Sequence, residues 1–264
     1  MSRLTQTFER LRARGRGGLV AYVTAGDPDL ETTAAILRAI DAAGADVIEV
    51  GVPFSDPLAD GPVIQRASER ALAAGASLGR TLSMLGYARP AIAAPIVLFS
   101  YANPILRMGL DAFADAAASA GVDGVLLLDL PIEEAGEAGA RLEAAGIDLV
   151  CLLSPTSTDQ RIDEAARRGR GFLYVISRLG VTGARDAVAS GAGGLVARIR
   201  ARTNLPIALG FGLSTPEHVR EACRHADAAV VGSALVQAIA DAGSRGEDPA
   251  AAAGHFVRWL TTPA

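Results

Sequence analysis

The chain has 264 residues, half of them hydrophobic and only 5% aromatic, so we expect one large core built from aliphatic side chains and alanine. Its formal net charge of −4 argues against a nucleic-acid or anionic-membrane surface. Two cysteines are too few for a disulfide framework, and no apolar run reaches the length of a membrane span, so we expect a soluble cytoplasmic protein.

The basic residues restrict the chemistry further. All 25 are arginine, so no side chain can form a lysine imine or act as a P-loop lysine. The three histidines, His218, His225 and His255, lie in late helical segments without the spacing of a catalytic zinc site. We therefore expect no metal site, and acid–base chemistry must rest on carboxylates, hydroxyls and backbone groups.

The first predicted element is an N-terminal helix, because Leu4, Phe8 and Leu11 recur at helical spacing. Short aliphatic runs, typical of strands covered on both faces, then alternate with longer amphipathic stretches, typical of helices. The predicted strands are Leu19–Thr24, Val47–Gly51, Ile96–Phe99, Gly124–Asp129, Leu149–Leu153, Phe172–Ile176, Ile207–Gly210 and Ala229–Gly232. The predicted helices between them are Asp29–Ala43, Leu78–Ala88, Leu110–Ala120, Glu133–Ala145, Asp159–Arg168, Gly193–Arg202 and Pro216–Arg224.

This order predicts a single-domain (β/α)8 TIM barrel over residues 1–264, with the N-terminal helix as an addition. An open doubly wound sheet is the alternative. In a barrel the active site lies at the carboxyl ends of the strands, on the strand-to-helix loops. Two of these loops are long: Val52–Gly61 and the glycine-rich Arg178–Gly194. The second suggests a lid over the barrel mouth, with plain disorder as the alternative.

Two carboxylates stand out at the second strand. Glu49 lies near the end of the aliphatic run, where a buried charge is costly unless it is paired or used. Asp60 follows on the proline-rich loop. One acid on a strand and one on a loop would give a pocket two proton-handling groups in different environments. The alternative is structural: Glu49 would pair with a buried arginine, and Asp60 would cap the next helix.

A phosphate site is expected at the last two strands. The run Gly210–Ser214 ends the seventh strand, and Gly232-Ser233-Ala234 ends the eighth and opens a helix. Loops seven and eight of many barrels bind phosphate with glycine amides and a helix N-terminus, which requires no lysine. Tight turns without a ligand are the alternative.

With these residues in place, the chain resembles the alpha subunit of tryptophan synthase over about Phe8 to Leu260. The most specific match is the uninterrupted run from Glu49 to Pro62, EVGVPFSDPLADGP. Supporting matches are Thr24–Pro28, Tyr101–Pro104, Asp129–Pro131, Ser177–Gly183 and Gly210–Gly212.

The resemblance implies retro-aldol cleavage of indole-3-glycerol phosphate to indole and glyceraldehyde 3-phosphate, in tryptophan biosynthesis. It implies no cofactor in this chain and a PLP-dependent beta-subunit partner that receives indole in an alpha2-beta2 complex. By match to the family, Glu49 and Asp60 are the catalytic acids, and Pro53 and Asp56 face the partner. The implied substrate-binding residues are Tyr22, Ser100, Leu126, Tyr174, Thr182 and Phe211, and the phosphate-binding residues are Gly183, Gly212, Gly232 and Ser233.

The residues agree with that chemistry. Breaking a carbon–carbon bond needs an electron sink, and an indole protonated at C3 supplies one without an imine or a metal. Glu49 would then shuttle protons, and Asp60 would accept from the indole N–H. Three other functions stay open: a different phosphate-binding barrel such as an epimerase, a stand-alone lyase that releases indole, and a catalytically silent barrel that acts as an allosteric subunit.

Overall fold

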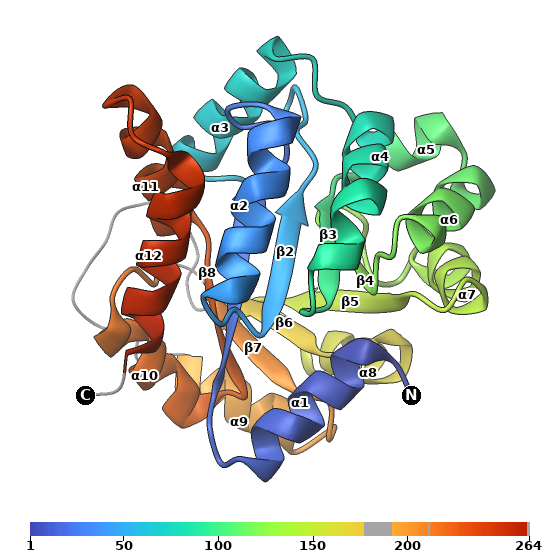
Figure 1. Ribbon diagram of the computed structural model, residues 1–264. Helices are drawn as coiled ribbons and strands as arrows, with labels where there is room; N and C mark the ends of the chain where they lie inside the picture. The colour runs from blue at the N-terminus through green and yellow to red at the C-terminus, as the bar shows by residue number, and fades with distance from the viewer. Residues whose placement is uncertain (177–191, 211, 263–264) are drawn as a thin grey trace.

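The computed structural model describes residues 1–176, 192–210 and 212–262. Eight parallel strands close into a barrel in the order of the sequence, as predicted, so the open doubly wound sheet is excluded (Figure 1). The strands are β1 Gly18–Thr24, β2 Val47–Gly51, β3 Ile96–Ser100, β4 Gly124–Leu127, β5 Asp148–Leu153, β6 Leu173–Ile176, β7 Ile207–Gly210 and β8 Ala228–Val231.

The helices surround the barrel and connect successive strands (Figure 1). They are α1 Arg3–Ala13, α2 Leu30–Ala42, α3 Pro62–Ala73, α4 Leu78–Ala88, α5 Ala102–Met108, α6 Leu110–Ser119, α7 Gly136–Ala144, α8 Asp159–Arg168, α9 Ala192–Arg200, α10 Pro216–His225, α11 Ser233–Ser244 and α12 Pro249–Thr261, with a 3-10 turn η1 at Arg89–Ala91. Within the described residues, no helix combines the length and the apolarity needed to cross a bilayer.

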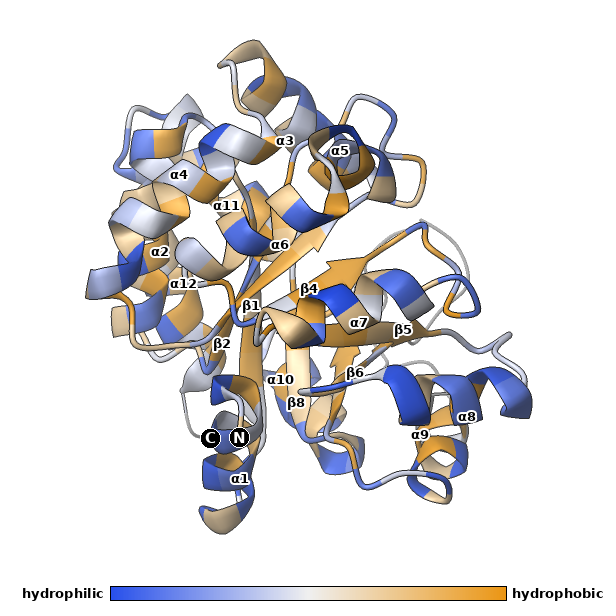
Figure 2. Ribbon diagram, turned by 90° about the vertical axis from the view of Figure 1, so that its right-hand side faces the viewer, coloured by the Kyte–Doolittle hydropathy of each residue, from blue (hydrophilic) through white to orange (hydrophobic). Residues whose placement is uncertain are grey.

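The barrel interior is mostly aliphatic, and the strands that form it are mainly hydrophobic (orange in Figure 2). Helix α1 closes the amino-terminal end of the barrel (Figure 1). Leu4, Phe8 and Leu11 of α1 are buried in one cluster with inward side chains of the strands, so the predicted N-terminal helix is confirmed. The rings of Phe8 and Phe172 lie 5.3 Å apart. A Cβ atom on Gly124 would lie only 2.8 Å from Leu4, so glycine at the start of β4 lets α1 approach. The open end is therefore the carboxyl-terminal one.

The prediction of strand Gly124–Asp129 was too long. β4 ends at Leu127, because the chain bends outward and the Asp129 carboxylate accepts the N–H of Ala102 at 2.7 Å, at the start of α5. The predicted helix Glu133–Ala145 begins only at Gly136, because two backbone turns, from Glu134 N–H to Pro131 and from Ala135 N–H to Ile132, precede it.

Helices α3, α5 and α12 were not among the predicted elements. α3 buries only Ala67, Ser68 and Ala71, and α5 buries only Ile105. Neither presents the stripe of large apolar residues from which helical periodicity is recognised.

Candidate active site

The carboxyl ends of the strands place three polar side chains inside the barrel mouth. Side chains two residues apart on a strand share a face. Val20, Val47 and Phe172 belong to the interior cluster. Tyr22, Glu49 and Tyr174 therefore lie on the same inward face, one layer nearer the mouth, and Tyr22 is opposite Glu49 in the β1–β2 register.

Glu49 is buried without a protein partner. It is 1% exposed, and neither of its carboxylate oxygens has a hydrogen-bond partner among the described residues. Burial, and next the charge of Asp60, raise the pKa of Glu49 from 4.5 to about 8. No arginine in the described part of the chain pairs with it, so the structural alternative for Glu49 is not observed.

Asp60 lies in the loop of residues 52–61 between β2 and α3, and it is 7% exposed. The Tyr101 hydroxyl donates a hydrogen bond to Asp60 Oδ2 at 3.0 Å. Burial raises the pKa of Asp60 to about 6, against the lowering effect of this hydrogen bond. The N-cap of α3 is Gly61, and no side chain caps that helix. Asp60 therefore does not cap this helix, which was the structural alternative to a catalytic role.

The two acids consequently hold different protonation states near pH 7. Glu49, with a pKa of about 8, is mainly protonated, whereas Asp60, with a pKa of about 6, is mainly ionised. A protonated acid and a carboxylate in one pocket can act as a proton donor and a charge-stabilising acceptor at the same pH.

The glycines at two strand ends make room for the tyrosine rings. A Cβ atom on Gly51 would lie 2.0 Å from the Tyr22 hydroxyl, and one on Gly210 would lie 2.8 Å from the Tyr174 hydroxyl. Tyr22 also packs edge-on against Phe99, with ring centroids 5.5 Å apart. Gly210 was part of the predicted phosphate motif. In the structure, the close approach of the Tyr174 ring explains why a glycine stands at this position.

Two further predicted substrate-binding residues lie at β3 and β4. Ser100 ends β3, is fully buried, and donates its hydroxyl to the Tyr101 carbonyl at 2.9 Å. Leu126 belongs to the apolar interior cluster. Thr182, Gly183 and Phe211 lie outside the described residues, as does nearly all of the glycine-rich loop predicted to be a lid. The last residues of that predicted loop, Ala192–Gly194, belong to α9.

The predicted phosphate residues are on the adjacent strands β7 and β8. Gly212 is exposed and has φ +76°, and no atom of the described residues lies within 4 Å of the place where its Cβ atom would stand. Gly232 is the N-cap residue of α11 and leaves that helix without a side-chain cap, and Ser233 is its exposed first residue. A Cβ atom on Gly232 would lie 3.5 Å from Tyr22, so this helix N-terminus borders the pocket of the two acids. Its first amides are positioned to bind an anion.

The residues predicted to face a partner lie on the same loop as Asp60. Pro53 is buried, whereas Asp56 is exposed and accepts a hydrogen bond from the Ser55 hydroxyl. Leu58, on the same loop, is 88% exposed. Sequence reasoning missed Leu58, and also Tyr101, although the Tyr101–Pro104 run that begins there had been noticed as a match to the family.

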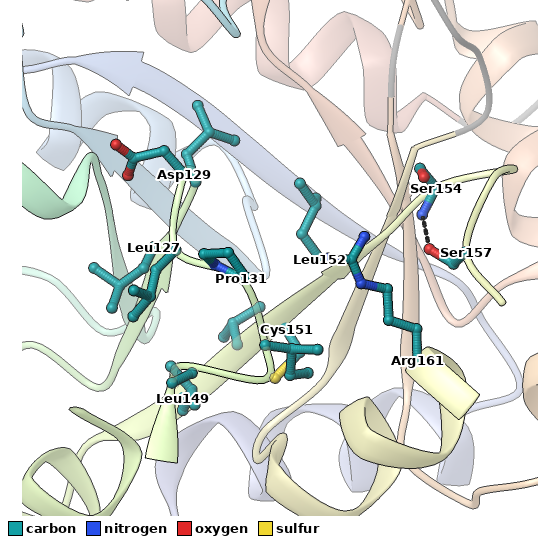
Figure 3. Close-up of a pocket in the computed structure, with 14 residues that line it drawn as sticks. Leu127, Asp129, Pro131, Leu149, Cys151, Leu152, Ser154, Ser157 and Arg161 are labelled. Atoms are coloured by element: carbon teal, nitrogen blue, oxygen red, sulfur yellow. Dashed lines mark hydrogen bonds between the residues drawn. The ribbon is translucent and has the colours of Figure 1, made fainter. Parts of the chain in front are cut away.

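A cavity of about 260 Å³ opens in the barrel wall between β4 and β5 (Figure 3). These strands pair only as far as Leu126 with Val150, whereas β5 continues to Leu153 along β6. Most of the residues lining the cavity are apolar, and the polar ones are Asp129, Ser154, Ser157 and Arg161. The strand pattern did not predict this cavity, and none of the predicted site residues lines it. No cluster of metal-binding side chains occurs in the residues that the structure describes.

Comparisons with known proteins agree on one family. The profile of the tryptophan synthase alpha chain family matches residues 8–260. The tryptophan synthase alpha chain of Citrifermentans bemidjiense is 51% identical over 237 residues, which cover 90% of this chain and 89% of the relative. That of Burkholderia thailandensis is 49% identical over 261 residues, which cover 98% and 96%.

Solved structures give the same result. Tryptophan synthase subunit alpha from Legionella pneumophila superposes with a TM-score of 0.89 at 37% identity, covering 98% of this chain and 97% of the other. Tryptophan synthase from M. tuberculosis, in an aminoacrylate-bound form, gives a TM-score of 0.87 at 34% identity, covering 98% and 100%. The chain therefore belongs to the tryptophan synthase alpha chain family, the lyases of indole-3-glycerol phosphate.

Proposed function

We propose that this lyase opens indole-3-glycerol phosphate to indole and glyceraldehyde 3-phosphate by proton transfer alone, with Glu49 and Asp60 as the catalytic acids. The observation that carries the proposal is the Glu49 carboxyl group, which is buried in the barrel mouth with neither oxygen bonded to a described residue. A group left in that costly state is explained if the substrate is its partner.

Glu49 acts first as an acid and then as a base. Its protonated form, favoured by the pKa of about 8, donates a proton to carbon C3 of the indole ring. The resulting carboxylate then takes the proton of the hydroxyl on the glycerol carbon bonded to C3. As that carbonyl forms, the carbon–carbon bond breaks and its electrons return to the ring. Glu49 ends the cycle with a proton again.

Asp60 stabilises the intermediate charge. Protonation at C3 gives the ring an iminium-like nitrogen, and an ionised Asp60 that accepts the indole N–H lowers the energy of that state. The indole itself is the electron sink, so the step requires neither a metal ion nor an imine. The absence of lysine from the chain agrees with this route.

The other predicted site residues form two groups, one for the indole end of the substrate and one for its phosphate. We propose that the indole side of the substrate contacts Tyr22, Ser100, Leu126, Tyr174 and Phe211, and that Thr182 is a further substrate-binding residue. The phosphate would bind the amides of Gly183, Gly212, Gly232 and Ser233, an assignment supported by the uncapped N-terminus of α11 beside Tyr22.

The family also implies a beta-subunit partner. We propose an alpha2-beta2 assembly in which the partner holds PLP and receives indole, and in which this chain itself holds no cofactor. The loop with Pro53 and Asp56 would face the partner, and Asp56 and Leu58 on that loop are exposed.

Two variants test the proposal. Glu49→Gln should still bind indole-3-glycerol phosphate but release no glyceraldehyde 3-phosphate. Asp60→Asn should slow cleavage by at least about 100-fold, the effect of removing one stabiliser of transition-state charge. Glu137→Gln, at an exposed position on α7, is the matched control and should keep the wild-type rate.

Calorimetry measures substrate binding, and single-turnover release of the aldehyde measures cleavage, each with and without a beta subunit. Substantial cleavage by Glu49→Gln would remove Glu49 from the mechanism, and a near-normal rate in Asp60→Asn would remove Asp60. An alpha subunit should be slow alone and faster with its partner, whereas a stand-alone lyase should not need one.

A further inference from the structure

We propose that Tyr101 is a positioning residue for the reaction: its hydroxyl group holds Asp60 in the pocket as a carboxylate, and its ring anchors the loop of residues 52–61. This inference rests on the proposed role of Asp60. Tyr101 follows β3 at the mouth of the barrel and is buried, although its backbone is the N-cap of α5.

One side chain contacts the loop at three positions. The Tyr101 hydroxyl donates to Asp60 Oδ2 at 3.0 Å and accepts the N–H of Ala59 at 3.2 Å. Its ring stacks on Phe54, with centroids 4.9 Å apart and planes inclined by 30°. The contacts therefore span the loop from near its start to its last acidic residue.

The remaining hydrogen bonds of the loop interior are local. Leu58 N–H bonds to the Asp56 carbonyl, Asp60 N–H bonds to the Pro57 carbonyl, and the Gln65 side chain bonds to the carbonyls of Pro57 and Asp60. These bonds link the loop only to itself and to α3, the helix that follows it in the chain. Among the described residues beyond the loop and α3, only Tyr101 forms side-chain hydrogen bonds with the loop.

The hydroxyl also favours the ionised form of Asp60. A hydrogen bond donated to a carboxylate stabilises the charged state, and here it opposes the desolvation that raises the pKa of Asp60. Burial and the charge of Asp60 raise the pKa of Tyr101, so the phenol keeps its proton and remains a donor. The other titratable groups coupled to Asp60 are Glu49 on β2, Tyr22 on β1 and Tyr174 on β6. None of these three brings a positive charge to replace the phenol.

Tyr101→Phe isolates the hydroxyl because it keeps the ring. Single-turnover cleavage of indole-3-glycerol phosphate by the full chain is measured from pH 5 to pH 9. The acid limb of the rate profile, which is the rise in rate at low pH, should shift to higher pH by about one to two units. A shift of this size is the effect of losing one hydrogen bond to a charged group. The variant should be about tenfold slower than the wild type at pH 6 and should approach it above pH 8.5. Adding the beta subunit should preserve this shift.

Two control variants separate the hydroxyl from general damage. Tyr87→Phe removes a hydroxyl from a tyrosine that is 81% exposed, and it should reproduce the wild-type profile. Phe54→Leu weakens the ring contact but keeps the hydroxyl, so its rate should fall by a factor that does not depend on pH.

Two outcomes overturn this inference: an acid limb in Tyr101→Phe that stays in place, or a loss of rate that is equal at every pH. Asp60→Asn distinguishes this failure from failure of the proposed function. If Asp60→Asn is inactive while the limb in Tyr101→Phe is unmoved, only the role of Tyr101 is wrong. If Asp60→Asn cleaves at the normal rate, the proposed mechanism fails first.

Discussion

The buried carboxyl group of Glu49 should make the protein less stable as the pH rises, and Glu49→Gln should remove that dependence. In the folded chain, burial holds the pKa of Glu49 at about 8, compared with 4.5 for an exposed glutamic acid. Between these values the unfolded chain has lost the proton and the folded chain still holds it. Stability therefore falls with rising pH across this range.

The size of the effect follows from the same two values. They differ by three and a half pH units, and each unit corresponds to 1.36 kcal/mol, so the full effect is about 5 kcal/mol. Glu49 is almost completely buried, so solvent screening reduces this figure little. Relative to wild type, Glu49→Gln should gain about 1.4 kcal/mol of unfolding free energy per pH unit between pH 5 and pH 8.

Urea denaturation of both proteins at pH 5, 6, 7 and 8 measures this difference. Asp60 also has a raised pKa, but it is present in both proteins, so most of its contribution cancels. Glu137→Gln, at an exposed position, should show a difference from wild type that does not change with pH. A constant difference between Glu49→Gln and wild type would refute the reasoning, because Glu49 would then ionise normally in the folded protein.

Three other predictions concern the pocket. The rate of cleavage should depend on pH as a bell, rising near pH 6 as Asp60 ionises and falling near pH 8 as Glu49 loses its proton; single-turnover rates check both limbs. Gly51→Ala should displace the Tyr22 ring, lowering the unfolding free energy by about 1–3 kcal/mol in urea denaturation and weakening substrate binding in calorimetry. Gly212→Ala should cost about 1 kcal/mol of stability because of its positive φ, and it should raise the KM for indole-3-glycerol phosphate while changing kcat less.

The barrel could be predicted because its strands are covered on both faces. Such strands read as nearly continuous aliphatic runs, and all residues of β1 and β2 are indeed buried. The element boundaries were less certain. Whether β4 continues to Asp129 depends on the contact of that carboxylate with Ala102, at the start of α5, and no local pattern contains that information. The buried residues of α3 are likewise small, so they do not give the pattern of large apolar residues from which a helix is recognised.

The two candidate acids could be identified from their residue types and their positions in the chain. The difference between their pKa values could not be predicted in this way. Glu49 lies in an aliphatic run and Asp60 in a proline-rich loop, and both facts are visible in the chain. The partner of Asp60 is Tyr101, 41 residues further along, and nothing near Asp60 in the sequence points to it.

The sequence by itself therefore determined the strand order, the family resemblance, the kinds of groups available for proton transfer and the absence of a lysine route. Only the tertiary structure showed that the Glu49 carboxylate has no hydrogen-bond partner among the described residues and that the Tyr101 hydroxyl binds Asp60. It also showed that Gly51 and Gly210 leave room for the rings of Tyr22 and Tyr174. The physical reason is that pKa values and steric fit depend on desolvation and on contacts between residues distant in the chain. Aliphatic patterning, in contrast, is a local property.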